Sequence, residues 1–372
     1  MAYGTINTDK LVGSSGGTLS PDSGVFRNRI INGAMVIDQR NAGASVTPVN
    51  TQYLVDRFQA ILTAASKFTV QQNAGSVTPP SGFTNYLGVT SSSAYSIGAG
   101  DIFGIGQNIE GYNMADFDFG KSTAKTITFS FWVRSSLTGT FGGSLNSSGD
   151  ARSYPFSYTI SAANTWEQKT VTIAGDTTGT WPITNGTGMR VFFSIGTGST
   201  YSGTAGSWAT AAYYAPTGAT SVVGTNGATF YITGVQLEKG STATSFDYRP
   251  YGTELQLCQR YYEKSFNTDT APTNGLVSYL KFTSSAITTT GAYGNSPPFA
   301  VEKRTNATIT CYRTDNGGTN SQPAYFRSGT WNNANSFSGN GGTRSFNYNF
   351  LGTFTTMEAL FTDFQWTASA EL

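Results

Sequence analysis

The sequence predicts an all-β protein: a β-sandwich, then a short helix, then a second, smaller β-sandwich domain. Segments in which apolar and polar residues alternate recur along most of the chain, as half-buried strands require. Gly, Asn, Asp or Thr clusters follow these segments and are typical of turns. Aromatic residues are 14% of the chain, which supplies core-forming groups. The 372 residues suffice for two domains at roughly 100–200 residues each.

The first 27 residues differ from the rest. They are polar, contain Gly, Ser and Pro, and show no sustained period. Two interpretations stay open: a flexible tail, or an extended arm that becomes ordered on a partner.

The clearest strand is residues 126–134, TITFSFWVR. Ile127, Phe129, Phe131 and Val133 fall on one face, which predicts a strand with that face buried. Short strands at such spacing build a sandwich or a related closed architecture. Similar segments are SYPFSYTI (153–160), QKTVTIAG (168–175), MRVFFSIG (189–196) and ATFYITGVQLE (228–238).

One segment interrupts the strands. Thr253 and Gln256 fit a helix-capping box, and Leu255, Cys258 and Tyr262 then recur at helical spacing. These residues predict a helix from Thr253 to Lys264. The helix lies between two β-rich halves, so we expect a linker helix over 251–265 to separate a β-sandwich (28–250) from a C-terminal β domain (266–372).

Strand patterns resume after the helix. The Gly-, Asn- and Ser-rich stretch 316–342 interrupts them, and we expect long loops there. The strand-like segments are GLVSYLKFTSS (275–285), NATITCYR (306–313), RSFNYNFLGTFT (344–355) and ALFTDFQWTASAEL (359–372).

Composition excludes several classes of function. The net charge of +1 gives no electrostatic footprint for a nucleic acid. No apolar run is long enough to cross a membrane, and the polar segment 1–10 shows no signal peptide. The chain has no histidine, which excludes Ser-His-Asp catalysis and His-containing metal sites. Cys258 and Cys311 are too few for a zinc cluster. One bridge between them is possible, but two unpaired thiols are the favoured interpretation.

Several segments resemble fibre proteins of bacteriophages, especially cyanobacterial and marine phages, that carry a carbohydrate-binding-module-like jelly roll. The most specific is FYITGVQLEKGSTATSFDYRPYGTELQLCQRYYEKS (230–265). The others are NRIINGAMVIDQRNAG (28–43), YLVDRFQ (53–59), TITFSFWVRSS (126–136) and TWEQKTVTIAGDTTGTW (165–181). Together they cover about residues 28–265, and the remainder looks only generally like the C-terminal β domain of a fibre.

The resemblance implies that the β-sandwich over residues 28–250 is a jelly roll. It also implies a structural protein of the virion, assembled in the host cytoplasm and usually a homotrimer. It implies that residues 1–27 attach to other virion proteins and that the distal part binds a host-surface glycan. Because the same module occurs on tail fibres, head fibres and baseplates, the position on the particle stays open, with a tail fibre favoured.

Carbohydrate binding commonly uses exposed aromatic rings that stack on sugar faces. The richest segment for this is 201–214, YSGTAGSWATAAYY, whose aromatic residues lie among small ones without strand alternation. Trp331, followed by Asn332 and Asn333, is a second candidate. Burial in the core is the alternative for every one of these rings. The predicted carbohydrate-binding residues are therefore Tyr201, Trp208, Tyr213, Tyr214 and Trp331.

Carboxylates are the remaining candidates for catalysis, because glycoside hydrolysis needs two of them at a defined separation. Asp116 and Asp118 are close enough in sequence to share a Ca²⁺ ion, although a turn beside a strand is the simpler interpretation. Glu238 and Asp247 have the cations Lys239 and Arg249 close by in the sequence, which suggests ion pairs.

We therefore expect a non-enzymatic binding protein that uses no cofactor and no metal. It would bind no nucleic acid and would not insert into a membrane. The alternatives are a purely structural head-fibre, decoration or baseplate subunit, and a polysaccharide-degrading tailspike.

Overall fold

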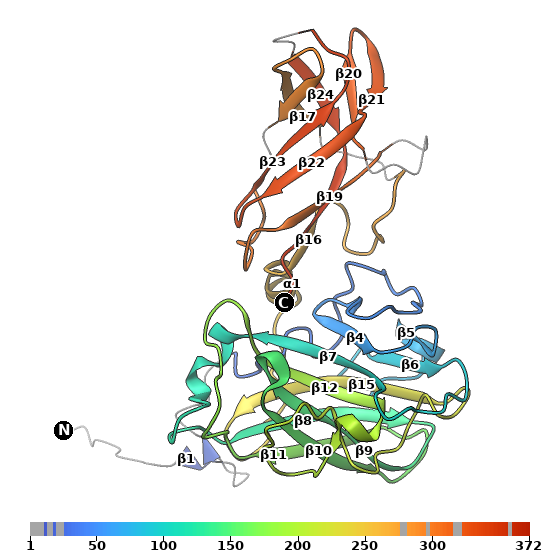
Figure 1. Cartoon of the computed structure of the whole chain (residues 1–372), viewed down its shortest axis with the longest axis vertical. Helices are drawn as coiled ribbons and strands as arrows, with labels where there is room; N and C mark the ends of the chain where they lie inside the picture. Colours follow the sequence, from blue (N-terminus) through green and yellow to red (C-terminus); the bar gives the residue numbers. More distant parts are fainter. Residues whose placement is uncertain are drawn as a thin grey trace, which may run out of the picture.

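The computed structural model describes residues 11–12, 18–19, 26–275, 281–294, 298–314, 322–355 and 359–372. It is an all-β protein with a jelly-roll sandwich at one end and a smaller, sandwich-like domain at the other (Figure 1). Most of the predicted arm, 1–27, lies outside the described residues. Within it, β1 (Leu11–Val12) pairs with β2 (Thr18–Leu19).

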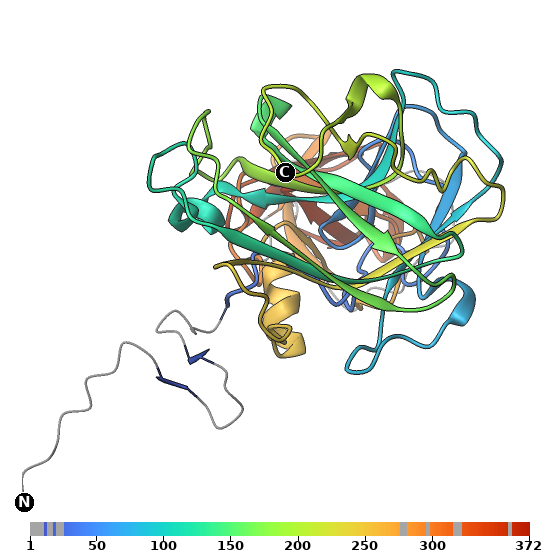
Figure 2. The same ribbon diagram turned by 90° about the horizontal axis from the view of Figure 1, so that it is seen from below.

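The jelly roll consists of two antiparallel sheets packed face to face (Figure 2). The first has the order β10-β9-β12-β7-β4-β3 and the second β11-β8-β15-β6-β5. The bounds of the first are β3 (Tyr53–Val55), β4 (Phe58–Leu62), β7 (Ile102–Glu110), β9 (Gly139–Ser147), β10 (Ser153–Ile160) and β12 (Thr187–Thr197). Those of the second are β5 (Phe68–Gln72), β6 (Leu87–Ser91), β8 (Ile127–Ser135), β11 (Glu167–Ile173) and β15 (Thr229–Lys239). Short elements between them are 3₁₀ turns η1 (Ala74–Ser76), η2 (Gly111–Phe117), η3 (Ser148–Asp150) and η4 (Ser199–Tyr201), and the parallel pair β13 (Ser202–Gly203) and β14 (Ala215–Pro216).

The core between the sheets follows from the alternation in β8. Its four apolar residues at odd positions, Ile127 to Val133, are fully buried. Phe131 packs edge-on against Phe193 of the facing sheet, with 5.0 Å between ring centroids. This aromatic core confirms the predicted buried face of β8.

The segment just after the arm is held along β15. Asn28 donates from Nδ2 to the Val235 carbonyl (3.0 Å), and its Oδ1 accepts from the backbone N–H of Leu237 (3.0 Å). The Val235 N–H donates to the Gly33 carbonyl (2.9 Å). A Cβ atom on Gly33 would lie 2.1 Å from the Val235 oxygen, so only glycine allows this approach. Asn28 and Gly33 therefore fasten the start of the domain to its last strand.

Helix α1 spans Tyr251–Gln259. The helix prediction is confirmed, but its bounds were wrong: α1 begins two residues before Thr253, no side chain caps it, and residues Tyr262–Lys264 form strand β16. Strand pairing with Ser369 and its neighbours overrides the helical spacing of Tyr262. The segment is also more than a linker, because Cys258 and Tyr261 pack with Ile31 and Ile37 in a buried cluster.

The C-terminal domain is one antiparallel sheet of ten described strands that curls around its own core. Its order is β16-β25-β19-β22-β23-β18-β17-β24-β20-β21. The sheet curls because β24 and β25 are consecutive parts of one strand, divided at Phe364, that pair at opposite ends of the order. The bounds are β17 (Lys281–Ala286), β18 (Gly291–Gly294), β19 (Thr308–Tyr312), β20 (Ala324–Arg327), β21 (Thr330–Asn333), β22 (Ser336–Gly341), β23 (Phe346–Leu351), β24 (Ala359–Asp363) and β25 (Gln365–Ser369).

The expectation of long loops over 316–342 was wrong for its described part, which contains β20, β21 and β22. The glycines there serve close packing. A Cβ atom on Gly341 would lie 1.9 Å from the Ala307 carbonyl oxygen, and one on Gly339 would lie 2.8 Å from Cβ of Ile309. In this stretch glycine therefore permits β22 to approach the chain around β19.

The last residues of the chain join the two domains, and the C-terminus lies between them (Figure 1). The Glu371 carboxylate contacts Arg57 and pairs with Arg40 at 2.8 Å, both from the jelly roll. Arg260 pairs with Glu110 of β7 at 2.6 Å. The junction is therefore built from ion pairs between largely buried groups.

Asp56, which is fully buried beside this junction, makes stability depend on pH. Its oxygens accept from the backbone N–H and the amide of Gln39, at 2.7 and 2.8 Å. Burial nevertheless raises the pKa of Asp56 from 3.8 to about 6, against the opposing effect of Arg40.

Because the folded pKa lies above the unfolded one, the native state holds the proton more tightly. We expect the contribution of Asp56 to be fully present below pH 3.8 and to be lost as pH rises to about 6. Over this pH range the free energy of unfolding should fall by about 3 kcal/mol. Urea unfolding of the wild type and Asp56→Asn across this range measures it. The variant should lack the downward slope, and equal slopes in both proteins would contradict the assignment.

Cys258 and Cys311 are both unpaired, as favoured from the sequence, and both thiols are buried. Burial raises the pKa of each thiol. Among the helices of the described part, none has the length and apolar character that crossing a membrane requires.

Candidate functional site

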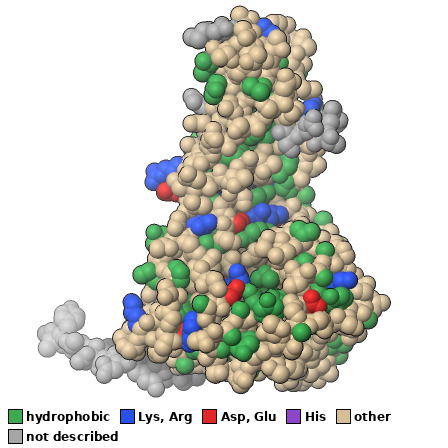
Figure 3. Space-filling model, viewed as in Figure 1, with side chains coloured by type: hydrophobic (Ala, Val, Ile, Leu, Met, Phe, Trp, Pro, Cys, Tyr) green, Lys and Arg blue, Asp and Glu red, His purple; other side chains and the backbone are tan. Residues whose placement is uncertain are grey.

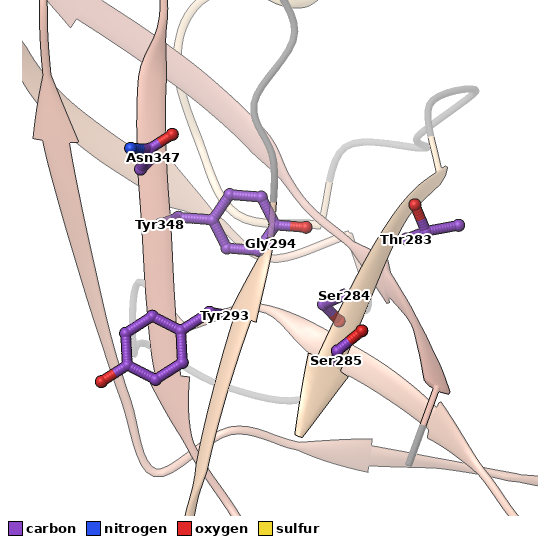
Figure 4. A pocket seen from close by; sticks show the side chains of 7 residues that line it. All are labelled: Thr283, Ser284, Ser285, Tyr293, Gly294, Asn347 and Tyr348. Carbon is purple, nitrogen blue, oxygen red and sulfur yellow. The ribbon is translucent and has the colours of Figure 1, made fainter. Parts of the chain in front are cut away.

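A pocket of about 350 Å³ opens on the C-terminal domain where β17, β18 and β23 lie side by side (Figure 4). We call it the polar pocket. Its lining residues are Thr283, Ser284, Ser285, Tyr293, Gly294, Asn347 and Tyr348. The volume is at the lower end of the roughly 300–1,000 Å³ of small-molecule sites.

The inner wall of the polar pocket is fixed by Tyr348. Its hydroxyl shares a hydrogen bond of 2.8 Å with Thr362, whose own hydroxyl donates to Ser284 (3.3 Å). Burial raises the pKa of Tyr348 to about 12, so the phenol stays protonated. A Cβ atom on Gly294 would lie 2.1 Å from the Tyr348 ring, so glycine is required for the ring to lie there.

The outer wall presents free hydrogen-bonding groups. Thr283, Ser285 and Asn347 are exposed, and within the described part of the chain their side chains make no hydrogen bond. Tyr293 adds a ring that is 51% exposed. The lining contains hydroxyls, an amide and aromatic rings but no Asp, Glu, Lys or Arg, a set suited to an uncharged polar ligand.

A row of aromatic side chains leads to this pocket across neighbouring strands. Trp331 of β21 lies opposite Phe326 of β20, and Phe326 lies opposite Phe361 of β24. Residues directly opposite in antiparallel strands point to the same face. The Phe326 and Trp331 centroids are 5.3 Å apart, and Phe361 and Trp331 are 53% and 42% exposed. We call these three residues the aromatic row.

The next residue in register is Thr283 of β17, opposite Phe361. The aromatic row therefore continues directly into the polar pocket. On the face of this domain seen in Figure 3, apolar patches lie among uncharged polar side chains and few charges.

Trp331 is the predicted binding residue that this site contains. Asn332 and Asn333, expected beside it, are engaged locally: the first donates to the Thr330 carbonyl (3.0 Å), and the second accepts from Arg313 (2.7 Å). Sequence reasoning missed Phe326, Phe361 and the pocket. The alternation in ALFTD carries the signal for Phe361, since it is out of phase with the buried Leu360.

The other predicted residues lie in the jelly roll, away from Trp331. Trp208 is half-buried, packs against Phe119, Tyr154 and Trp181, and donates to the Ala174 carbonyl (2.7 Å). Its indole therefore covers the edge of the main core.

Tyr201 and Tyr214 meet edge-on over the outer face of the six-stranded sheet. Tyr214 is buried, so the expectation of an exposed ring there was wrong. Its hydroxyl donates to Asp150 (2.7 Å), and burial together with this bond raises the pKa of Tyr214. Tyr213 is half-buried, with its ring against Gly203. The loop 201–214 thus packs on the sandwich.

The acidic residues considered as catalytic or Ca²⁺-binding candidates all form ion pairs or accept hydrogen bonds. Asp116 pairs with Arg29 (2.8 Å) and Lys239 (3.4 Å), and Asp118 pairs with Lys121 (2.9 Å). The described residues include no cluster of three His, Cys, Asp or Glu side chains placed to hold a metal ion.

Glu238 and Asp247 bind hydrogen-bond donors, so the suggested pairing with Lys239 and Arg249 was wrong. Glu238 accepts from the backbone and hydroxyl of Thr244, and Asp247 accepts from the Asn28 N–H. Arg249 pairs instead with Glu254 at 3.2 Å.

No protein-family model matches the chain, and no curated protein matches it. Among solved structures, it is similar to the enzymatically active domain of bacteriophage CBA120 tailspike protein 4, with 12% identity, a TM-score of 0.32, and coverage of 57% of this chain and 22% of that one. A putative sugar-binding protein from Bacteroides thetaiotaomicron matches with 11% identity, a TM-score of 0.33, and coverage of 57% and 100%.

A third similar structure is the C-terminal family 22 carbohydrate-binding module of Clostridium thermocellum Xyn10B, with 15% identity, a TM-score of 0.27, and coverage of 50% and 89%. The chain thus spans under a quarter of the tailspike structure. Similarities this low do not bear on what the chain binds.

Proposed function

We propose that this protein binds a neutral glycan on the outer face of its C-terminal domain. The observation that carries the proposal is the aromatic row, which is exposed and runs in register into the uncharged polar pocket. Aromatic rings can stack on the apolar faces of sugar rings, while hydroxyl and amide groups bind sugar hydroxyls. Since no charged side chain lines the pocket, we expect affinity to depend little on salt.

The binding is proposed to be non-enzymatic. Two buried carboxylates of the jelly roll are engaged in ion pairs: Glu110 pairs with Arg260 and also accepts from Tyr261, and Asp176 pairs with Arg152. The polar pocket itself contains no acid, whereas glycoside hydrolysis needs two. Release of reducing ends from a bound glycan would contradict this part of the proposal.

We further propose that the protein is a phage virion fibre, with a tail fibre favoured, that forms a homotrimer and attaches by residues 1–27. The motifs of residues 28–265 support this. Several weak sites on one particle would bind firmly through their effective concentration. Two measurements test it: light scattering should give three times the 39.5 kDa chain mass, and mass spectrometry of purified virions should detect the chain.

Trp331→Ala tests the glycan proposal. We expect the variant to stay folded, since the side chain lies on the surface and is 42% exposed, and to lose about tenfold or more in affinity for neutral glycans on an array. Tyr112→Ala is the matched control, because Tyr112 is a 61% exposed aromatic of the jelly roll. It should bind as the wild type does.

Trp331→Ala, together with Phe361→Ala in the same aromatic row, separates glycan binding from a second possibility, that this face packs against another copy of the chain. A smaller mass for Trp331→Ala or Phe361→Ala in light scattering, with glycan binding unchanged, would identify a subunit interface. Unchanged mass with weakened glycan binding supports the proposed function.

A further inference from the structure

The aromatic row and the polar pocket form one continuous lane across the sheet. Trp331, Phe326, Phe361 and Thr283 are in register on four neighbouring strands, β21, β20, β24 and β17. At about 4.8 Å per strand, three steps cover about 14 Å. A lane of this length is longer than a single sugar ring.

At β17 the side chains along the lane change from apolar rings to polar groups. Two residues beyond Thr283, Ser285 lies opposite Tyr293 of β18, and Tyr293 lies opposite Asn349 of β23. Side chains two residues apart on a strand share a face and lie about 7 Å from each other. The apolar rings therefore occupy one end of the lane, and the hydroxyls and amides occupy the other.

We infer that the ligand is an extended, uncharged oligosaccharide that crosses the strands, with one end in the polar pocket and the chain extending over the aromatic row towards Trp331. This inference rests on the proposed function. The pocket, at about 350 Å³, holds the liquid volume of roughly a dozen waters, which is suited to an end ring and not to a chain. Stacking on the row tolerates different sugars, whereas directional hydrogen bonds in the pocket select among them.

The two ends of the lane should respond differently to ligand length. Trp331 is three strands away from Thr283, so a short ligand held in the pocket does not reach it. Asn347 lines the pocket itself, so a ligand of any length whose end occupies the pocket lies within reach of the Asn347 amide. Both side chains are exposed, and alanine there should leave the fold intact.

The experiment is calorimetric titration with cello-, manno- and galacto-oligosaccharides, each from the monosaccharide to the hexasaccharide. For the series that binds, we expect affinity to rise about tenfold with length and then level off. Trp331→Ala should remove this gain and leave the shortest ligands unaffected. Asn347→Ala should weaken all lengths, and Tyr112→Ala should weaken none.

Length-independent affinity in the wild type would overturn the inference while leaving the proposed function in place. So would an equal loss for short and long ligands in Trp331→Ala, or a loss confined to long ligands in Asn347→Ala. If no oligosaccharide of any length binds to the folded wild type, the proposed function itself fails.

Discussion

Arg57→Ala is expected to lower the free energy of the first unfolding transition by about 3–5 kcal/mol. Arg57 is 1% exposed, contacts the Glu371 carboxylate, donates to the Asn108 carbonyl (2.7 Å) and lies 3.6 Å from the Tyr261 ring centroid. Its loss would leave a largely buried carboxylate with Arg40 alone and a carbonyl without its donor. Chemical denaturation followed by tryptophan fluorescence measures the change.

Arg344→Ala is the matched control for this prediction. Arg344 pairs with Glu302 at 3.0 Å, but the side chains are 81% and 51% exposed. Such surface pairs contribute about 1 kcal/mol or less. If the two variants lose equal stability, the buried junction does not hold the domains together as described.

Gly33→Ala is the second change with a large expected effect, a loss of about 3 kcal/mol or more. The added methyl group would lie 2.1 Å from the Val235 oxygen, on backbone that cannot yield. Segment 28–33 would have to move away from β15, which strains the packing and breaks hydrogen bonds worth about 1 kcal/mol each. Thermal and urea unfolding of the purified variant measure the loss.

Gly252→Ala provides the control of opposite sign. Gly252 lies in α1, and a Cβ atom there would have no neighbour within 4 Å. Alanine in a helix is favoured over glycine by about 0.5–1 kcal/mol. If Gly252→Ala is more stable than the wild type while Gly33→Ala unfolds as the wild type does, the contact between segment 28–33 and β15 is not tight.

Strands with strong alternation were predictable because their period reports directly which face is buried. The segment 153–160 coincides with β10, and 126–134 matches β8 within one residue. Glycine-rich strands were not predictable, since Gly339 and Gly341 resemble turn residues until Ala307 and Ile309 are seen against them. The predicted end of α1 was wrong for a similar reason, because Tyr262 pairs with Ser369, which is more than a hundred residues away in the sequence.

The sequence by itself determined the all-β class, the buried face of β8, the presence of a helix near residue 255 and the absence of histidine chemistry. These properties depend on composition and on local period. Only the tertiary structure decided which aromatic rings are buried and which are exposed. Trp208 and Tyr214 pack against the jelly roll. Trp331 instead lies on the strand surface opposite Phe326, which in turn lies opposite Phe361. The reason is register: pairing between distant strands chooses the face and neighbours of each ring, and no local pattern encodes it.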